Sequence, residues 1–111
     1  MRYIANAFSV NMIGTFPVDI HIDEIDVDQA ASYAEDATSI VGHTDTANVF
    51  SSTLGVPVTC NRTTVAVRIG DEVIVGQYRG PRLPEGARVL PAGATIQWFS
   101  VQVGWNSSQL K

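Results

Sequence analysis

Cysteine and histidine, the residues that build most metal and redox sites, are scarce in this chain. Its 111 residues contain one cysteine, Cys60, and two histidines, His21 and His43. A single cysteine provides neither a disulfide framework nor a cysteine-rich metal site, and we expect Cys60 to be a small buried thiol. Because no spacing of histidine, cysteine and carboxylate matches a metal-ligand pattern, the sequence predicts no metal site and no cofactor.

Long apolar runs are missing too. No segment approaches the ~20 apolar residues that span a bilayer, and the first residues, MRYIANAFSVNMIG, lack the apolar core of a signal peptide. We therefore expect a cytoplasmic protein without a membrane partner, located in the host cell cytoplasm if a virus encodes it. A hydrophobic content of 45% predicts a single globular domain over residues 1–111.

Positive charge is also in short supply. The formal net charge is −4, which argues against duplex DNA or RNA as a partner, because proteins that bind duplexes present basic surfaces. Eight of the eleven acids lie between residues 19 and 45, and five of the seven bases lie between 62 and 88. All bases inside the chain are arginines, which bind phosphate or carboxylate in a bidentate fork. A small, locally bound anionic ligand is compatible with this distribution.

Alternation of apolar and polar residues predicts six strands. We expect them at residues 2–7, 17–23, 56–61, 63–69, 72–78 and 94–105. In the second strand Val18, Ile20 and Ile22 share one face, and His21 lies among carboxylates on the other as an exposed residue. The pair Gly70-Asp71 predicts a tight turn that joins the fourth and fifth strands in a hairpin.

Helical spacing and capping residues predict two short helices. The first runs from Asp26–Asp28 to about Glu35, and the second begins at Thr44 or a neighbour and ends at Gly55. The glycine- and proline-rich segment 80–93 is expected to be an ordered loop. The last strand is apolar on both faces, which predicts contact with the core on one side and with a helix or partner subunit on the other. The fold class is therefore α+β, with a mixed, mostly antiparallel sheet flanked by two short helices.

His43 stands where the second predicted helix begins. A helix N-terminus offers unpaired N–H groups to a phosphate, and imidazole exchanges a proton near neutral pH. His43 shares a stripe with Ala47, Phe50 and Leu54 at helical spacing, so we expect it to face a cleft or the core. Helix capping by a histidine with satisfied hydrogen bonds explains its position equally well.

Two other segments carry residues suited to ligand binding. Asn6, Ser9 and Asn11 interrupt an apolar run, and their side chains can bind phosphate, ribose or base edges, although turn formation explains them as well. The loop 80–93 carries Arg82 and Glu85, for which a local ion pair is the alternative. Nucleotide-binding glycine motifs, a P-loop and a nucleophile elbow are all missing. Any chemistry is therefore expected to be metal-free acid–base catalysis by one histidine and one carboxylate.

Four motifs, in this order, resemble those of the viral ring nuclease family. They are YIANAFSVNM, GHTDTA ahead of a helix, Asn61-Arg62, and QYRGPRLPEG before a last aromatic strand, and they span Tyr3 to about Phe99. These type III anti-CRISPR enzymes degrade cyclic tetra-adenylate, the second messenger of type III CRISPR defence. The resemblance implies a metal-independent nuclease with cyclic tetra-adenylate as its partner. A sponge that binds the cyclic nucleotide without cutting it is the alternative.

The resemblance also implies residue roles. His43 matches the general acid that protonates the departing 5′ oxygen, Glu85 matches a glutamate that assists catalysis, and Arg82 matches the arginine that faces the scissile phosphate. Four positions match residues that line the ligand pocket: Asn6, Ser9, Asn11 and Gln77. A ring of four identical nucleotides has a two-fold axis, so we expect a homodimer that places two opposite phosphates against two copies of His43 and releases two linear di-adenylates.

Overall fold

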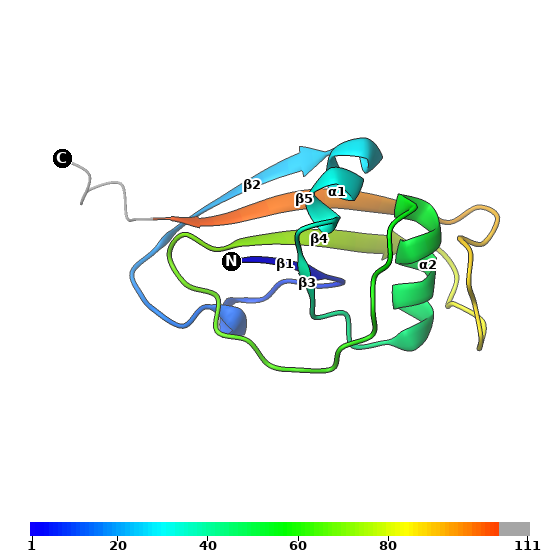
Figure 1. Cartoon of the computed structure of the whole chain (residues 1–111), viewed down its shortest axis with the longest axis horizontal. Coiled ribbons are helices and arrows are strands. Elements are labelled where there is room, and N and C mark those ends of the chain that lie inside the picture. Colours follow the sequence, from blue (N-terminus) through cyan, green and yellow to red (C-terminus); the bar gives the residue numbers. More distant parts are fainter. Residues whose placement is uncertain (105–111) are drawn as a thin grey trace.

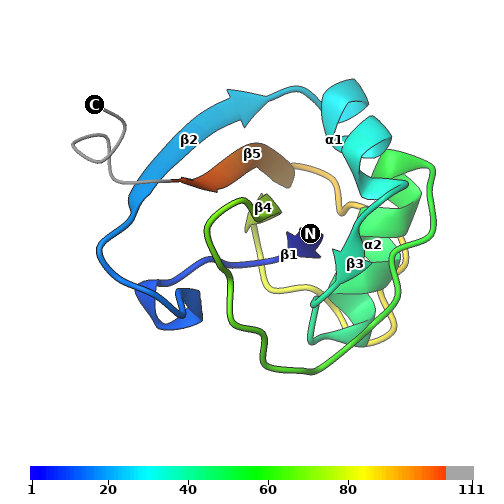
Figure 2. The ribbon, with the colours of Figure 1, turned by 60° about the vertical axis from the view of Figure 1, so that its left-hand side comes forward.

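A five-stranded sheet with two helices on one face forms the structure, a computed structural model that describes residues 1–104 (Figure 1). The strand order is β2-β5-β4-β1-β3. The elements along the chain are β1 (Arg2–Ala5), the 3-10 helix η1 (Val10–Met12), β2 (Asp19–Ile25), α1 (Val27–Ala34), β3 (Thr38–Ser39), α2 (Thr44–Leu54), β4 (Glu72–Arg79) and β5 (Thr95–Gly104). Helices α1 and α2 cover the same side of the sheet, and η1 lies on the opposite side (Figure 2).

Strand directions make the sheet mixed. Strand β1 pairs in parallel with β4 over four residue pairs and with β3 over two. The antiparallel pairings are longer, with eight residue pairs between β4 and β5 and seven between β2 and β5. The predicted α+β class, with a mostly antiparallel mixed sheet and two short helices, is confirmed. Strands β3, β1 and β4 all end at the same edge of the sheet, which we call the carboxyl edge.

Two hydrophobic cores lie on opposite faces of this sheet. On the helix side, Phe50 of α2 meets Trp98 of β5 edge-on with ring centroids 4.9 Å apart. On the other side, Val67, Val73 and Val101 pack beneath η1. Strand β5 is thus apolar on both faces because it contributes to both cores. Its contact with a helix on one face was predicted from the sequence.

The local signals for the two helices are confirmed. The carboxylate of Asp26 accepts a hydrogen bond from the Gln29 N–H at 2.8 Å, which caps α1. Helix α2 ends at Gly55, whose φ of 73° is a left-handed conformation that favours glycine. Each helix therefore begins and ends within one or two residues of its predicted position.

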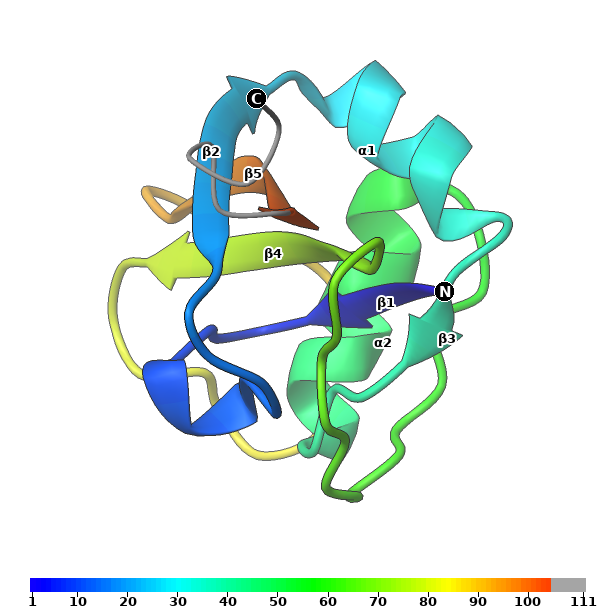
Figure 3. The same ribbon diagram turned by 90° about the vertical axis from the view of Figure 1, so that its left-hand side faces the viewer.

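The predicted strands at 56–61 and 63–69 are wrong, and so is the hairpin at Gly70-Asp71. The connection between α2 and β4 is irregular (Figure 3). Two isolated bridges pair Cys60 with Val41 and Val67 with Ile13, and neither partner belongs to a strand of the sheet. Strand β4 is already paired on both sides, by β1 and β5, so no edge was left for a hairpin partner. The turn at 70–71 does form, with Asp71 N–H donating to the Arg68 carbonyl at 2.9 Å. Because its segment lacks a neighbouring strand, Cys60 is exposed and not buried as predicted.

Candidate functional site at the carboxyl edge

The carboxyl edge collects residues from three strand ends that are far apart in the sequence. Asn6 follows β1, His43 lies four residues after β3, and Gln77 is near the end of β4. Side chains beyond the carboxyl ends of adjacent parallel strands converge, which makes this edge a common place for ligand sites in α/β sheets. Strand direction therefore brings sequence positions 6, 43 and 77 to the same edge of the sheet, which motif order alone does not show.

His43 is the N-cap residue of α2, with φ −124° and ψ 128°. Its carbonyl accepts a hydrogen bond from the Ala47 N–H at 3.0 Å, but its ring makes no capping hydrogen bond. His43 was predicted to face a cleft or the core; it is exposed, so it does not face the core. The helical stripe is buried at Ala47, Phe50 and Leu54, but an N-cap residue has extended backbone and its side chain leaves the helical periodicity. Capping by the imidazole, the alternative explanation, is also wrong.

Loop 80–93 is fixed at its base and along its length. The Tyr78 hydroxyl donates to the Pro81 carbonyl at 2.6 Å. Gly80 has φ 155°, and a Cβ there would lie 2.7 Å from the Cβ of Ala94, so only glycine fits. The segment is ordered, as predicted, without a helix or strand of its own.

One contact brings this loop to the beginning of α2. The Gly86 N–H donates to Oδ2 of Asp45 at 3.3 Å, and Asp45 lies in the first turn of the helix that His43 caps. Glu85, next to Gly86, is therefore held near the same helix end. Within residues 1–104 no ion pair joins Glu85 to Arg82 or to His43, so the local ion pair between Arg82 and Glu85 is not formed.

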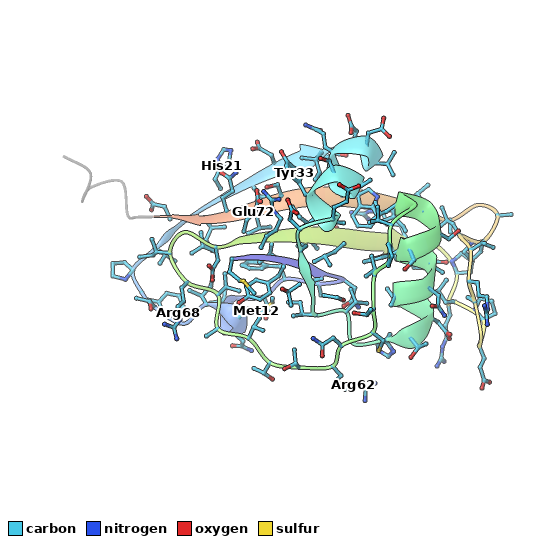
Figure 4. All side chains as sticks on the ribbon, in the orientation of Figure 1. Met12, His21, Tyr33, Arg62, Arg68 and Glu72 are labelled. Atoms are coloured by element: carbon cyan, nitrogen blue, oxygen red, sulfur yellow. The ribbon has the colours of Figure 1, made fainter. Side chains whose placement is uncertain are left out.

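Arg62 is a residue at this helix end to which the sequence interpretation gave no role. Its Nε donates to the Gly42 carbonyl at 3.2 Å, which places the guanidinium beside the residue that precedes His43. Figure 4 shows Arg62 on the long connection between α2 and β4. The sequence interpretation placed Arg62 between two predicted strands, 56–61 and 63–69, that do not form, and this incorrect assignment hid its proximity to His43.

An open groove lies on the face of the sheet opposite the helices. It has a volume of about 410 Å³, and its apolar lining comes from Phe8, Ile22, Val75, Phe99 and Val101, with Asn6 and Gln77 as its polar side chains. Ile22 is 55% exposed, because no element covers the β2 end of this face. The alternation of β2 was predicted correctly, but the face that it defines is open. His21 is exposed as expected and contacts Asp23 at 3.0 Å.

A smaller pocket of about 230 Å³, the η1 pocket, adjoins the open groove at Asn6. It also contains Asn11 and two threonines, Thr63 and Thr64. Ser9, at the start of η1, lines neither space, and its backbone N–H donates to the sulfur of Met12 at 3.4 Å. The structure therefore groups Asn6 with Gln77 and with Asn11, and groups the Glu85 segment with His43. Arg82 is exposed and joins neither group through a contact within residues 1–104.

Residues 1–104 contain neither a cluster of metal ligands nor a membrane-spanning helix. Among residues 1–104, histidine, cysteine and carboxylate side chains nowhere gather in threes around a common point. No helix in that range is long and apolar enough to cross a membrane.

Comparison with known proteins identifies relatives of this chain. The family described as STIV B116-like matches residues 2–92. The solved structure of B116 of Sulfolobus turreted icosahedral virus superimposes with a TM-score of 0.79 at 27% sequence identity, covering 91% of this chain and 97% of the viral protein. None of the curated proteins searched matches the sequence. Since the family match extends over most of its length, the chain belongs to the STIV B116-like family.

Proposed function

We propose that this protein is a metal-independent ring nuclease that cleaves cyclic tetra-adenylate to linear di-adenylates and so counteracts type III CRISPR signalling. The observation that carries the proposal is the meeting of His43, Arg62 and the Glu85 segment at the first turn of α2. One imidazole, one guanidinium and one carboxylate beside free helix N–H groups are the set that phosphodiester cleavage by an internal nucleophile needs. Kinship to a viral protein agrees with this role.

The chemistry uses a nucleophile that the substrate itself supplies. A ribose 2′-hydroxyl loses its proton to solvent and attacks the adjacent phosphorus, and the bond from phosphorus to the 5′ oxygen breaks. His43 donates a proton to that oxygen, so the products carry a 2′,3′-cyclic phosphate and a 5′-hydroxyl. Arg62 and Arg82 neutralise charge on the phosphoryl oxygens, and Glu85 orients the imidazole. A general acid in this position contributes about 10²–10⁴-fold to the rate.

A sponge that binds the ring without cutting it is the second candidate. It is favoured by the exposure of His43 and by the missing ion pair between His43 and Glu85 within residues 1–104. Catalytic contacts in a ligand-free enzyme are often longer than in the substrate complex, so this geometry is also compatible with the nuclease. The two candidates differ in product formation, which is directly measurable.

We also propose that the protein acts as a homodimer joined through the open groove. The groove is lined by apolar side chains and continues to Ile20, which is 38% exposed on the same face of β2. Exposed apolar surface of this kind marks interaction sites. Because Asn6 and Gln77 lie in the groove, a second copy seated there brings two sets of these amides together, which matches a ligand with a two-fold axis.

The cleavage proposal is tested with labelled cyclic tetra-adenylate in the presence of EDTA. We expect conversion to di-adenylates by the wild type and a loss of about 10²–10⁴-fold in the His43→Ala variant, with ring affinity retained. The matched control is His21→Ala, which removes the chain's other histidine from an exposed site and leaves the rate unchanged. Binding without product identifies the sponge, and unchanged turnover in His43→Ala refutes the general-acid role.

A further inference from the structure

Strand β2 forms one edge of the sheet and has a neighbouring strand on one side only (Figure 1). It pairs with β5 over seven consecutive residue pairs, from Asp19 to Ile25, and no bulge interrupts this register. In an antiparallel pair every second residue directs its N–H and C=O groups away from the partner strand. Residues 20–25 therefore present backbone groups that no other strand within residues 1–104 binds.

The opposite edge of the sheet differs in length and in cover. Strand β3 has two residues, and residues 59–61 lie against it. The Ser39 hydroxyl donates to the Thr59 carbonyl, and the Asn61 side-chain amide donates to the Ser39 carbonyl at 2.8 Å. Short length and a covering segment protect a sheet edge from pairing with another chain. Of the two edges, β2 is the long and uncovered one, so it is the edge where another strand can pair.

The charge around β2 decides which kind of segment fits this edge. The sequence contains no lysine or arginine between Arg2 and Arg62, whereas seven carboxylates lie between residues 19 and 36. Asp23 and Glu24 of β2 form no ion pair with an arginine within residues 1–104. A second copy of β2 brings the same carboxylates to the contact, and like charges on paired strands are destabilising. The charge therefore favours a basic segment over a second copy.

A groove at the end of β2, the acidic groove, has room for side chains of an added strand. Its volume is about 520 Å³, and it lies where the chain leaves the sheet for α1. Glu24 and Asp26 supply its carboxylates, and Val27, Ile96 and Trp98 belong to its apolar lining. A lining that is both apolar and acidic suits lysine or arginine, because the methylene stem packs on apolar surface while the charged end reaches a carboxylate.

We propose that the edge of β2 binds an extended, basic segment of a partner protein as a sixth strand of the sheet. Backbone hydrogen bonds along residues 20–25 supply the affinity, and basic side chains beside Asp23 and in the acidic groove supply the preference for sequence. The surface is separate from the proposed cleavage site, because the acidic groove reaches Thr53 in the last turn of α2, whereas His43 caps the other end of that helix. The proposal therefore goes beyond ring cleavage and does not depend on it.

A seven-residue peptide of alternating lysine and valine is the probe, because it is basic and matches β2 in length. We expect this peptide to slow hydrogen exchange at every second backbone amide between residues 20 and 25 of the full-length protein, as measured by NMR, because these amides gain an acceptor. The same peptide N-methylated at every residue keeps its charge but has no N–H groups to donate. It is expected to bind at least about 10-fold more weakly and to give no alternating protection.

Two double variants test the contribution of charge at matched positions. Asp23→Asn with Glu24→Gln removes two carboxylates from β2 and is expected to weaken binding of the peptide about 2- to 10-fold, as for two exposed ion pairs. Glu35→Gln with Asp36→Asn removes two carboxylates just after α1, on the way to the β3 edge, and should leave the affinity unchanged. Isothermal titration calorimetry measures both affinities.

Equal binding of the N-methylated peptide, or equal weakening in the two double variants, shows that the peptide responds to negative charge alone and overturns strand addition. Slow exchange of all amides between residues 20 and 25 in the free protein also overturns it, because a second copy then occupies the edge. If the peptide protects β2 and no ring is cleaved, the proposed function fails and this surface stands. If the ring is cleaved and β2 gains no protection, the surface fails and the function stands.

Discussion

At the scale of single residues, the arginines of this chain differ in what surrounds them. Arg62 is held beside the beginning of α2 by the Gly42 carbonyl, whereas Arg82 stands exposed in loop 80–93 with no hydrogen bond or ion pair to another residue in 1–104. Arg68 is equally exposed but lies just before β4, at the end of the sheet remote from the carboxyl edge. Arg82 and Arg68 carry the same charge at different ends of the sheet. Replacing each of them in turn therefore separates a role in the proposed site from a general effect of positive charge.

Replacing Arg82 by alanine is expected to weaken binding of cyclic tetra-adenylate and to slow its cleavage. A charge-assisted hydrogen bond contributes roughly 1.5–3 kcal/mol, so the loss in kcat/KM should be about 10- to 100-fold. Arg68→Ala removes the same charge at the remote end and should leave both quantities unchanged. Steady-state cleavage and equilibrium binding measure the two effects, and equal behaviour of the two variants means that Arg82 is only a surface charge.

Glu72 connects three strands at the amino end of β4. Its carboxylate accepts from Arg2 of β1 at 2.6 Å and from Ser100 and Gln102 of β5 at 2.8 and 3.4 Å, and Arg2 also stacks on Tyr33 of α1. Figure 4 shows Glu72 and Tyr33 close together on the helix side. Burial raises the pKa of Glu72, but these hydrogen bonds and the charge of Arg2 outweigh it, so the pKa is lowered below its ordinary value.

This lowered pKa predicts a pH-dependent contribution to stability. The contribution is fully present above the pKa of an unfolded glutamate, about 4.3, and is lost as the pH falls through the lower folded value. Glu72→Gln should therefore lower Tm at pH 7 and have a smaller effect at pH 3. Thermal unfolding of both proteins at several pH values tests this, and a difference in Tm that stays constant with pH contradicts it.

At the scale of elements, β4 must approach α2 and β5 closely. A Cβ at Gly76 would lie 2.6 Å from both Phe50 Cζ and Trp98 Cζ3, so the absence of a side chain lets these two rings pack against the strand. A sequence pattern of alternating residues treats this glycine as a gap in the strand. In the structure, the backbone of Gly76 is the surface against which the Phe50 and Trp98 rings of the helix-side core pack.

Gly76→Ala is expected to destabilise the protein by about 1–3 kcal/mol, because an extra methyl in a filled core displaces its neighbours. Gly104→Ala is the matched control, since a Cβ there has its nearest neighbour 3.9 Å away. Chemical denaturation gives both values. Equal stability of the two variants shows that the rings move apart at no cost.

Sequence signals predicted the helices better than the strands, for a physical reason. The cap at Asp26 and the left-handed end at Gly55 act within four residues, so they are visible locally. Strand formation at 63–69 depends on a free neighbouring strand, and β4 had none. The same applies to the site: residue types and their order indicated His43 and Asn6, but Thr63 and Thr64 were hidden because only the tertiary fold brings residues 63–65 beside η1.

At the scale of the whole molecule, the two faces of the sheet differ: helices cover one face, and the open groove lies on the other. The helix side carries α1 and α2 (Figure 2). The opposite side exposes Ile22 beside the groove. The proposed homodimer through the groove would account for this difference, because it would cover the apolar side and leave the helices in solvent.

Ile22→Asp is expected to convert a dimer to a monomer by burying an unpaired carboxylate in the contact. Val27→Asp places the same charge on an exposed apolar residue at the start of α1 and should leave the dimer intact. Analytical ultracentrifugation gives the mass of each variant, with twice the chain mass expected for wild type and control. A monomeric wild type refutes the dimer, and a dimeric Ile22→Asp variant places its contact elsewhere.

The position of β1 between β4 and β3 has a consequence for the order in which the protein assembles. Strand β1 pairs with residues 38–39 on one side and with residues 72–75 on the other. Such distant pairings close large loops and slow folding. A nascent chain that lacks β4 therefore has only a two-residue partner for β1, and the carboxyl edge is incomplete until β4 has been synthesised.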